Sequence, residues 1–272
     1  MAWVAVVRNS LTRAGPREDL GAVADRWTLA PGEVHVWLCA GEAVADEAWL
    51  AAALQVCDAE ERARHDRFVF ARSRRQFTVA RALVRRVLAS YAGIAAEALA
   101  FVANQYGRPE LACGPAGLRF NLSHADGLAA LAVARDAELG VDVEDALRRS
   151  RPEDIAEHFF AAAEVAALMR LPADQRPRRF FDLWTLKEAY IKARGMGLAI
   201  PLGAFAYDLS RGREAIDLAI DPSLGDARAG WHFTLADPTP RHRLALAVRF
   251  PGGAAPVLRT RWIWPEGPGL LS

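Results

Sequence analysis

The sequence predicts a protein of mixed helices and strands, built from two similar halves. Its 272 residues, 52% of them hydrophobic, suffice for a sizeable core and suit either one large domain or two closely packed halves. Strand-like and helix-like segments follow one another twice in the same order: a strand, then helices, then paired strands. The tetrapeptide Ala-Leu-Ala-Val at residues 130–133 recurs at 245–248. Because alanine-rich sequence repeats by chance, the order of the elements carries most of this prediction.

The first predicted half covers residues 33–136. It follows an N-terminal extension, residues 1–32, which lacks clear periodicity and is expected to be irregular. Asp58 is expected to cap a long helical region that ends near Gly93, because Glu61 stands at the distance of a capping box. The strands and turns expected around this region are 34–38, 107–109, 120–122 and 128–134, with a polar connection over 123–127.

The second predicted half covers residues 137–250. One helical region is expected to open at Ser150, and another begins near Pro177 and ends at Gly195. Strands are expected at 140–144, 231–235 and 243–250. In the Pro- and Gly-rich tail, residues 251–272, two tryptophans alternate as in one further edge strand that packs on the body; they are Trp262 and Trp264.

Composition excludes several classes of function. The net charge is +1 at pH 7 and the pI is near 7.8, whereas proteins that bind nucleic acid or membrane surfaces generally carry excess positive charge. No apolar run is long enough to span a membrane, and the apolar start is too short for a signal peptide. Cys39, Cys57 and Cys113 are odd in number and form no CxxC pattern, so we expect reduced thiols. These features predict a soluble cytoplasmic protein that binds neither nucleic acid nor membrane.

Two acidic residues alternate with valines in the segment GVDVE, residues 140–144. On a strand, positions i and i+2 point to one face, so the side chains of Asp142 and Glu144 are expected about 7 Å apart. Two carboxylates that close raise each other's pKa unless a cation neutralises them, which suggests a hard divalent metal. A solvated strand face is the alternative explanation for this pair.

Both lysines of the chain lie in one stretch, WTLKEAYIKARGMG, which begins at Trp184; the other 32 of the 34 basic residues are arginines. Glu188 and Lys192 share a helical face with Trp184. An i,i+4 ion pair stabilises an exposed helix by about 0.2–0.5 kcal/mol and explains this spacing, but arginine would serve as well. A retained lysine therefore suggests a need for a compact point charge. The apolar residues of this helix predict that Glu188 is partly desolvated.

Nine arginines and one acidic residue lie between Arg62 and Arg86. A solvated basic helix face is the common explanation of such a run. Alternatively some of the arginines, Arg64 and Arg75 foremost, bind phosphates through their bidentate donors.

Ser123 and His124 follow a predicted strand. Neighbouring side chains generally point apart, so the two are not a nucleophile and its base, and no Gly-x-Ser-x-Gly motif is present. Phosphate binding by the hydroxyl and the imidazole is the better interpretation, although the chain has neither a Walker A nor a Gly-x-Gly-x-x-Gly motif.

Three segments, taken in order, resemble a known family. They are Phe120-Asn121-Leu122-Ser123-His124, Gly140-Val141-Asp142-Val143-Glu144 and Trp184-Thr185-Leu186-Lys187-Glu188-Ala189-Tyr190-Ile191-Lys192, preceded by Tyr106-Gly107-Arg108-Pro109. Together they resemble the signatures of the 4′-phosphopantetheinyl transferases, and their joint occurrence is specific although each piece is weak. The Gly-x-Asp motif stands mid-chain, which favours the large, single-chain Sfp-type subfamily over the small trimeric holo-acyl-carrier-protein synthases.

The resemblance implies an α+β fold of two similar α/β halves related by a pseudo-twofold axis, each a small antiparallel-rich sheet with packed helices. It implies a monomeric enzyme that transfers 4′-phosphopantetheine from coenzyme A to a serine hydroxyl of an apo acyl or peptidyl carrier protein, and that releases adenosine 3′,5′-bisphosphate. Mg²⁺, or Mn²⁺ in its place, would bridge the coenzyme A pyrophosphate.

The resemblance also assigns roles to residues. Asp142, Glu144 and Glu188 would hold the metal, and Glu188, directly or through a metal-bound water, would accept the serine proton. Lys192 would contact the phosphates, supported by Lys187. Further contacts with coenzyme A are expected from Arg64, Arg75, Arg108, Ser123 and His124. The chain departs from the family where Glu61 and Arg64 stand, in a neighbourhood that often holds lysine.

Two other functions stay open at this point. One is a non-catalytic domain that binds coenzyme A or a carrier protein, and the other is Mg²⁺-dependent pyrophosphate hydrolysis. Three metal-binding acids disfavour the first, since binding alone does not require them. The lack of a Nudix-type Glu-rich helix disfavours the second.

Overall fold

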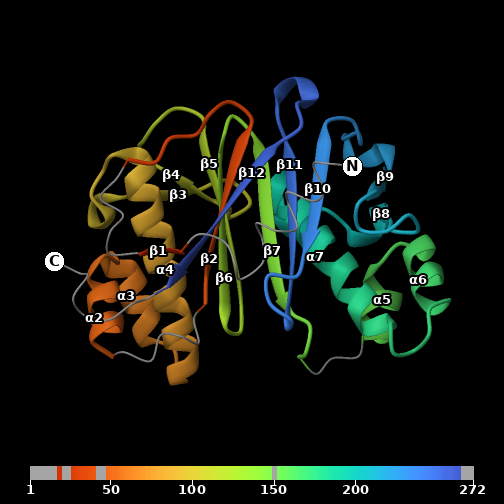
Figure 1. Ribbon diagram of the computed structural model, residues 1–272, viewed down its shortest axis with the longest axis horizontal. Coiled ribbons are helices and arrows are strands. Elements are labelled where there is room, and N and C mark those ends of the chain that lie inside the picture. The colour runs from red at the N-terminus through yellow and green to blue at the C-terminus, as the bar shows by residue number, and fades with distance from the viewer. Residues whose placement is uncertain (1–16, 20–25, 41–46, 149–151, 265–272) are drawn as a thin grey trace.

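A computed structural model describes residues 17–19, 26–40, 47–148 and 152–264 and shows two halves side by side (Figure 1). Within these residues each half contains a strand, three helices, a two-stranded hairpin and two more strands. The first half consists of β2 (Glu33–Cys39), α2 (Glu47–Gln55), α3 (Ala59–Asp66), α4 (Ala71–Ala92), β3 (Phe101–Ala103), β4 (Pro109–Leu111), β5 (Leu118–Ala125) and β6 (Leu128–Arg135). The second consists of β7 (Glu138–Asp145), α5 (Pro152–Phe159), α6 (Ala162–Met169), α7 (Arg176–Arg194), β8 (Phe205–Asp208), β9 (Asp217–Ile220), β10 (Trp231–Ala236) and β11 (His242–Arg249).

The strand order of the two sheets repeats as well. In the first half the order is β2-β6-β5 and in the second β7-β11-β10, with every neighbouring pair antiparallel. The repeated tetrapeptide lies on the middle strand of each half but faces opposite ways: Ala130 of β6 points into the core shared by the two sheets, whereas Ala245 of β11 packs on the α7 side. The prediction of an α+β fold with two similar halves is therefore confirmed.

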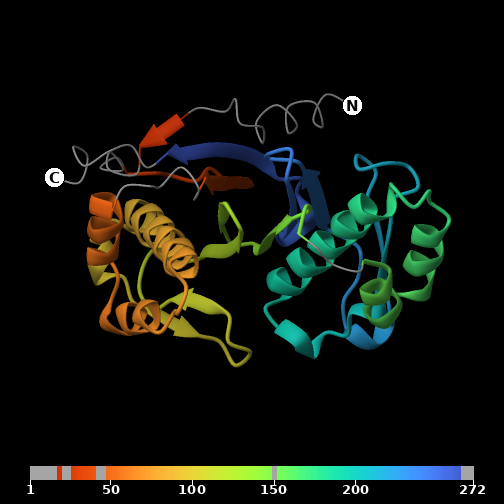
Figure 2. The same cartoon turned by 90° about the horizontal axis from the view of Figure 1, so that it is seen from below.

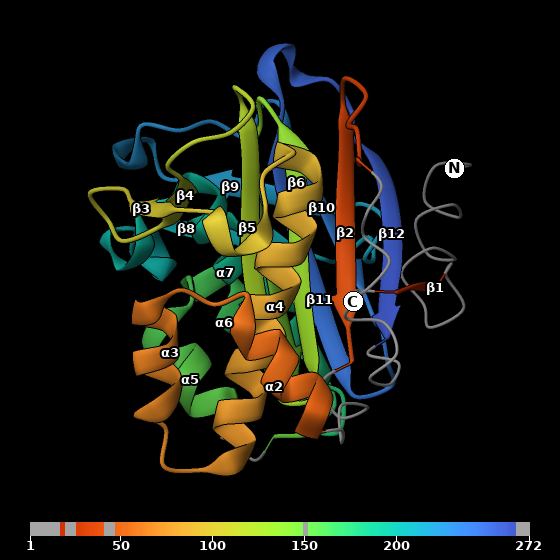
Figure 3. The ribbon, with the colours of Figure 1, turned by 90° about the vertical axis from the view of Figure 1, so that its left-hand side faces the viewer.

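The C-terminal tail joins the first sheet. Strand β12 (Val257–Trp264) runs parallel to β2 on one side and to β1 (Arg17–Asp19) on the other (Figure 3). The predicted strand exists, but it lies inside the described sheet and not at its edge. The edge position belongs to β1, which lies in the extension that was expected to be irregular. This short segment has no periodicity of its own, and pairing with the distant strand β12 orders it.

Most predicted helix ends are confirmed. Asp58 caps α3 with a reciprocal capping box to Glu61, and α4 and α7 end at Gly93 and Gly195 in the left-handed conformation, with φ of 66° and 63°. The long region after Asp58 is two helices, α3 and α4, because the chain leaves the helical path after residue 66. Ser150 lies outside the described residues. In the described part of the chain, no helix combines the length and hydrophobicity needed to cross a membrane.

Three buried clusters hold the fold together. One packs α4 on the first sheet, through side chains such as Leu83 and Leu131, and a second packs α7 on the second sheet, through side chains such as Leu186 and Ala247. The third joins residues of both sheets, including Val36, Val141 and Trp262. The halves thus share a core on the face of the sheets away from α4 and α7.

Candidate active site

The two halves meet along β5 and β7, between α4 on one side and α7 on the other (Figure 2). Side chains of β5 here take the place of strand pairing. The Val141 amide N–H donates to Asn121 Oδ1 at 2.9 Å, and the Val143 N–H donates to Ser123 Oγ at 3.2 Å. Because buried amides need partners, these two bonds set the register between the halves.

Along β7, the side chains alternate between the shared core and the cleft. Val141 and Val143 lie in the core, and Asp142 and Glu144 point the other way. Burial, reinforced by the negative charge of Asp142, raises the pKa of Glu144 to about 7. The indole N–H of Trp184 donates to Glu144 Oε1 at 3.0 Å, which opposes this rise.

Helix α7 crosses β7 so closely that residue 140 must be glycine. A Cβ at Gly140 would lie 2.0 Å from the Ala189 carbonyl oxygen and 2.4 Å from the Ala193 amide nitrogen. Because backbone atoms cannot turn aside, any side chain here would push the helix off the strand. Glycine therefore brings α7 within reach of the β7 carboxylates.

One face of α7 looks into the cleft. Between Phe180 and Ala193, the side chains that are not buried are Trp184, Glu188 and Lys192, each four residues from the next. Burial and the charge of Asp142 raise the pKa of Glu188, and the charge of Lys192 opposes this effect. Glu188 therefore shares its electrostatic environment with both residues.

Lys192 and Asp142 form the closest ion pair in this group. Lys192 Nζ donates to Asp142 Oδ1 at 2.6 Å and to Ser123 Oγ at 3.0 Å. The Ser123 hydroxyl donates to the same Asp142 oxygen at 2.9 Å. The other oxygen, Asp142 Oδ2, is buried and has no hydrogen-bond partner. Such an oxygen carries an unrecovered desolvation cost, which a cation placed beside it would remove.

The donor chemistry fits a hard divalent metal, because Asp142, Glu144 and Glu188 supply carboxylate oxygens and one of these is buried without a partner. Nevertheless, among the described residues no three His, Cys, Asp or Glu side chains are arranged so that they could hold a metal ion. Metal binding would thus require the carboxylates to draw closer together than they are here.

His124 and Arg64 lie together on the first-half side of the cleft. The surrounding protein and the charges of Lys192 and Arg64 hold the pKa of His124 below its ordinary value. His124 Nδ1 lies 3.2 Å from the amide nitrogen of Gln76, which donates to it. The exposed Arg64 guanidinium stacks over the Phe77 ring at 5.6 Å. His124 therefore lies close enough to Lys192 and to Arg64 to feel the charges of both.

Two other predicted arginines lie farther out. Arg75 is 3.7 Å from Glu47 of α2 and lines a cavity of about 300 Å³ beside the β5–β6 turn. Arg108 donates to the Ala193 carbonyl at 3.2 Å and to Glu110 at 2.6 Å, so it neutralises the C-terminal end of α7. For both residues, contact with coenzyme A stays a prediction.

Two predicted contacts need correction. Strand β5 continues through Ala125, so Ser123 lies on a strand and not in a polar connection. Its hydroxyl is buried and already bonds Asp142, Lys192 and Val143, which leaves no position for a phosphate in this conformation. Its role here is to join the halves.

Lys187 does not face the cleft. Its ammonium is fully buried and has three partners, Glu164 Oε2 at 2.7 Å and the carbonyls of Leu202 at 2.8 Å and Phe205 at 2.7 Å. All three of its donors are therefore used. The prediction that Lys187 supports the phosphates is wrong, because Lys187 lies on the buried face of α7, together with Leu186.

The sequence did not predict the hydrogen bonds of three residues that shape the site. Asn121 accepts from β7, Trp184 donates to Glu144, and Gln76 donates to His124. The first two stand inside the motif segments, where their polar side chains could have been assigned to hydrogen-bonding groups of β7. Gln76 stands among the arginines of α4, and nothing in its sequence context indicated a contact with His124.

Comparisons with known proteins identify the family of this chain. The model of the 4′-phosphopantetheinyl transferase superfamily matches residues 138–247, and that of the 4′-phosphopantetheinyl transferase N-terminal region matches residues 44–136. The two matches meet where β6 ends and β7 begins.

Several curated proteins are similar in sequence. The 4′-phosphopantetheinyl transferase HetI of Nostoc sp. is 37% identical over 174 residues, which are 63% of this chain and 73% of that protein. The transferase psf-1 of Bacillus pumilus is 34% identical over 57% of this chain and 65% of its own length. The transferase Sfp of Bacillus subtilis is 26% identical over 62% of this chain and 71% of its own. With its two repeated halves and its cleft of carboxylates, this chain therefore belongs to the 4′-phosphopantetheinyl transferase superfamily and, within it, to the Sfp type.

Proposed function

We propose that this chain transfers the 4′-phosphopantetheine group of coenzyme A to a serine hydroxyl of an apo acyl or peptidyl carrier protein, as a cytoplasmic monomer. The serine oxygen bonds to the phosphorus that carries pantetheine, the pyrophosphate P–O bond breaks, and adenosine 3′,5′-bisphosphate leaves. The observation that carries the proposal is the buried, unpartnered Asp142 Oδ2 beside Lys192, in a chain of this family.

The proposed metal ligands are Asp142, Glu144 and Glu188. A bound Mg²⁺, or Mn²⁺, would neutralise charge on the pyrophosphate of coenzyme A. The protein's part would be to hold three carboxylates that repel one another in one region, from which they draw together around the ion. The raised pKa values of Glu144 and Glu188 are the sign of that repulsion and of burial.

Glu188 is the proposed base for the serine proton. A carboxylate whose pKa is raised by burial and by a neighbouring negative charge accepts a proton more readily than an exposed one, and Glu188 looks into the cleft from α7. Lys192, one turn later, supplies positive charge where the phosphates would lie. Phosphoryl transfer depends chiefly on such positioning and charge neutralisation.

Coenzyme A is proposed to lie across the junction of the halves. His124 feels the charges of Lys192 and Arg64, and we assign the 3′-phosphate to His124 and Arg64. Arg108 and Arg75 would contact this end of the molecule only after leaving Glu110 and Glu47.

Metal binding can be tested without turnover. Titration of Mn²⁺ into the metal-free protein, followed by calorimetry, should show one site for the wild type. Asp142→Asn should weaken it about 100-fold, because a neutral amide replaces the central carboxylate. The exposed acid Asp208 offers a matched control, Asp208→Asn, which should bind as the wild type does. Equal affinity in all three proteins would remove the metal assignment.

Transfer itself is tested by the mass of the carrier. The protein is incubated with coenzyme A, Mg²⁺ and an apo carrier protein, and the carrier is then weighed. A gain of one phosphopantetheine supports transfer. An unchanged carrier with intact coenzyme A would point to binding alone, and an unchanged carrier with cleaved coenzyme A to hydrolysis; either result, across several carriers, would refute the proposal.

A further inference from the structure

Asp126, in the turn between β5 and β6, is held by residues of both halves. From its own half, Arg72 of α4 donates from Nε to Asp126 Oδ1 at 2.6 Å. From the other half, Arg241 Nη2 donates to Asp126 Oδ2 and also to Asp145 Oδ2, the latter at 2.7 Å. His242 Nε2 lies 2.7 Å from the Asp126 carbonyl oxygen. We call these five residues the Asp126 clasp.

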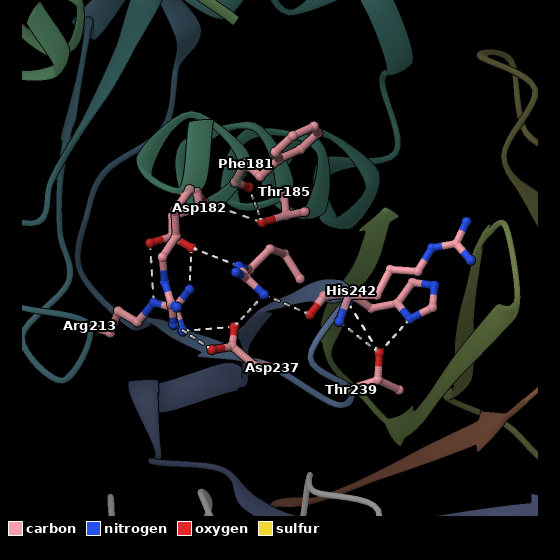
Figure 4. Close-up of polar contacts among 10 residues, drawn as sticks. Phe181, Asp182, Thr185, Arg213, Asp237, Thr239 and His242 are labelled. Carbon is pink, nitrogen blue, oxygen red and sulfur yellow. Dashed lines mark hydrogen bonds and ion pairs between the residues drawn. The ribbon is translucent and has the colours of Figure 1, made fainter. Parts of the chain in front are cut away.

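The chemistry of the clasp is complementary throughout. Two guanidinium groups, of Arg72 and Arg241, face the two carboxylates of Asp126 and Asp145, so the charges balance. A carbonyl oxygen can only accept, so His242 Nε2 must carry a proton and donate it. His242 is buried, and its other ring nitrogen lies 2.7 Å from Thr239 Oγ1 (Figure 4).

The clasp lies next to both sides of the cleft. Asp126 follows His124 by two residues, and Asp145 directly follows Glu144. Gln76, one turn after Arg72 on α4, donates to the Ala125 carbonyl at 2.8 Å, so the turn is also tied to the helix. A shift of the β5–β6 turn would therefore move His124 relative to the β7 carboxylates.

In the equivalent turn of the second half, the contacts of the aspartate described here stay within that half, although Arg241 of the same turn belongs to the clasp. Asp237, between β10 and β11, lies 2.8 Å from Arg213 (Figure 4). It also lies 2.7 Å from Arg178 and 3.2 Å from Arg243. All of these partners belong to the second half. The two turns thus carry the same aspartate with arginine partners, but only the Asp126 contacts described here join the halves.

We propose that Asp126 is a positioning residue, which holds the β5–β6 turn against the second half and so sets the separation between His124 and the carboxylates of β7. An isolated exposed ion pair would fix little. Here, two arginines and a buried histidine converge on one residue from two halves, which restricts the turn in more than one direction. The consequence for coenzyme A rests on the proposed function, but the consequence for the junction does not.

The junction can be tested in the ligand-free protein. The amides of Val141 and Val143 donate across the junction of the halves, to Asn121 and Ser123, so their hydrogen exchange reports on the separation. In Asp126→Ala we expect both amides to exchange about tenfold faster than in the wild type. In the matched variant Asp237→Ala they should exchange as in the wild type. Unchanged exchange in Asp126→Ala, or equal acceleration in both variants, would overturn the proposal.

Kinetics give a second, separate readout. Asp126→Ala should raise KM for coenzyme A about tenfold with little change in kcat. The substitution displaces His124, which is proposed to bind coenzyme A, and leaves the carboxylates of β7 and α7 in place. Arg241→Lys, which can still pair with both acids, should lie near the wild type, and Arg241→Met should resemble Asp126→Ala. Equal KM values in all variants would refute the positioning role. If Asp126→Ala does not fold, Asp126→Asn takes its place in both assays. If the wild type transfers nothing, the proposed function fails and amide exchange still decides the role of the clasp.

Discussion

Lys192 Nζ lies 2.6 Å from Asp142 Oδ1, whereas Asp142 Oδ2, on the same carboxylate, is buried without a partner. The lysine thus neutralises one oxygen and leaves the second for another cation. A guanidinium would behave differently, because its parallel donors tend to engage both oxygens of a carboxylate at once. This difference gives a physical reason for lysine at position 192 in a chain whose other cations, Lys187 apart, are arginines.

Lys192→Arg should therefore lose both transfer and metal affinity, although the charge is kept. We expect transfer to fall about 100-fold, because the fork occupies Asp142 Oδ2 and crowds Ser123. Initial rates of carrier modification measure the first effect and Mn²⁺ titration the second. The exposed Arg74 provides the control Arg74→Lys, which should leave both unchanged. A fully active Lys192→Arg enzyme would show that the lysine is only structural.

Lys187 should matter for stability and not for phosphate binding. Its buried ion pair with Glu164 is fully desolvated, so Lys187→Met leaves an uncompensated charge and should lower the free energy of unfolding by about 3–5 kcal/mol. The double variant with Glu164→Gln should recover much of this loss, since glutamine still accepts a backbone N–H. Urea unfolding measures all three proteins. A double variant no more stable than the single one would contradict this account.

Glu144 should make stability depend on pH. Its pKa is raised from 4.5 to about 7, so between these values the folded protein holds a proton that the unfolded chain has released. Its contribution to stability therefore falls as pH rises through this window, by up to about 3 kcal/mol, and is constant above it.

Glu144→Gln removes this titration. In metal-free buffer the variant should be more stable than the wild type at pH 8, and the difference should shrink toward pH 5. Urea unfolding at several pH values gives the difference directly. A gap between the two proteins that is the same at all pH values would mean that Glu144 has an ordinary pKa in the folded state.

The sequence predicted the features that depend on local chemistry. Capping by Asp58 and Glu61 and the glycine helix ends need only neighbouring residues, and the repeated order of elements follows from periodicity. The motif segments predicted which residues line the cleft because α7 and β7 each present a regular face. Trp184, Glu188 and Lys192 illustrate this, as do Asp142 and Glu144.

Features that depend on distant partners could not be predicted. Nothing near Lys187 indicates that Glu164 lies in the core beside it, and nothing near Asp126 indicates Arg241, which stands 115 residues later. The first half has a related ion pair, between Glu61 and Arg81. Glu61 is the third residue of the short helix α3 and Arg81 lies on the long helix α4, just as Glu164 is the third residue of α6 and Lys187 lies on α7.

Glu188→Gln tests whether transfer depends on the carboxylates between β7 and α7, because it removes one proton-accepting oxygen while keeping the size of the side chain. Wild type and variant are incubated with coenzyme A, Mg²⁺ and an apo carrier protein, and the intact mass of the carrier is followed in time. The account predicts that the wild type adds one phosphopantetheine per carrier and that the folded variant adds it at least about 100-fold more slowly. Equal rates for the two proteins would show that transfer does not occur at the carboxylates between β7 and α7.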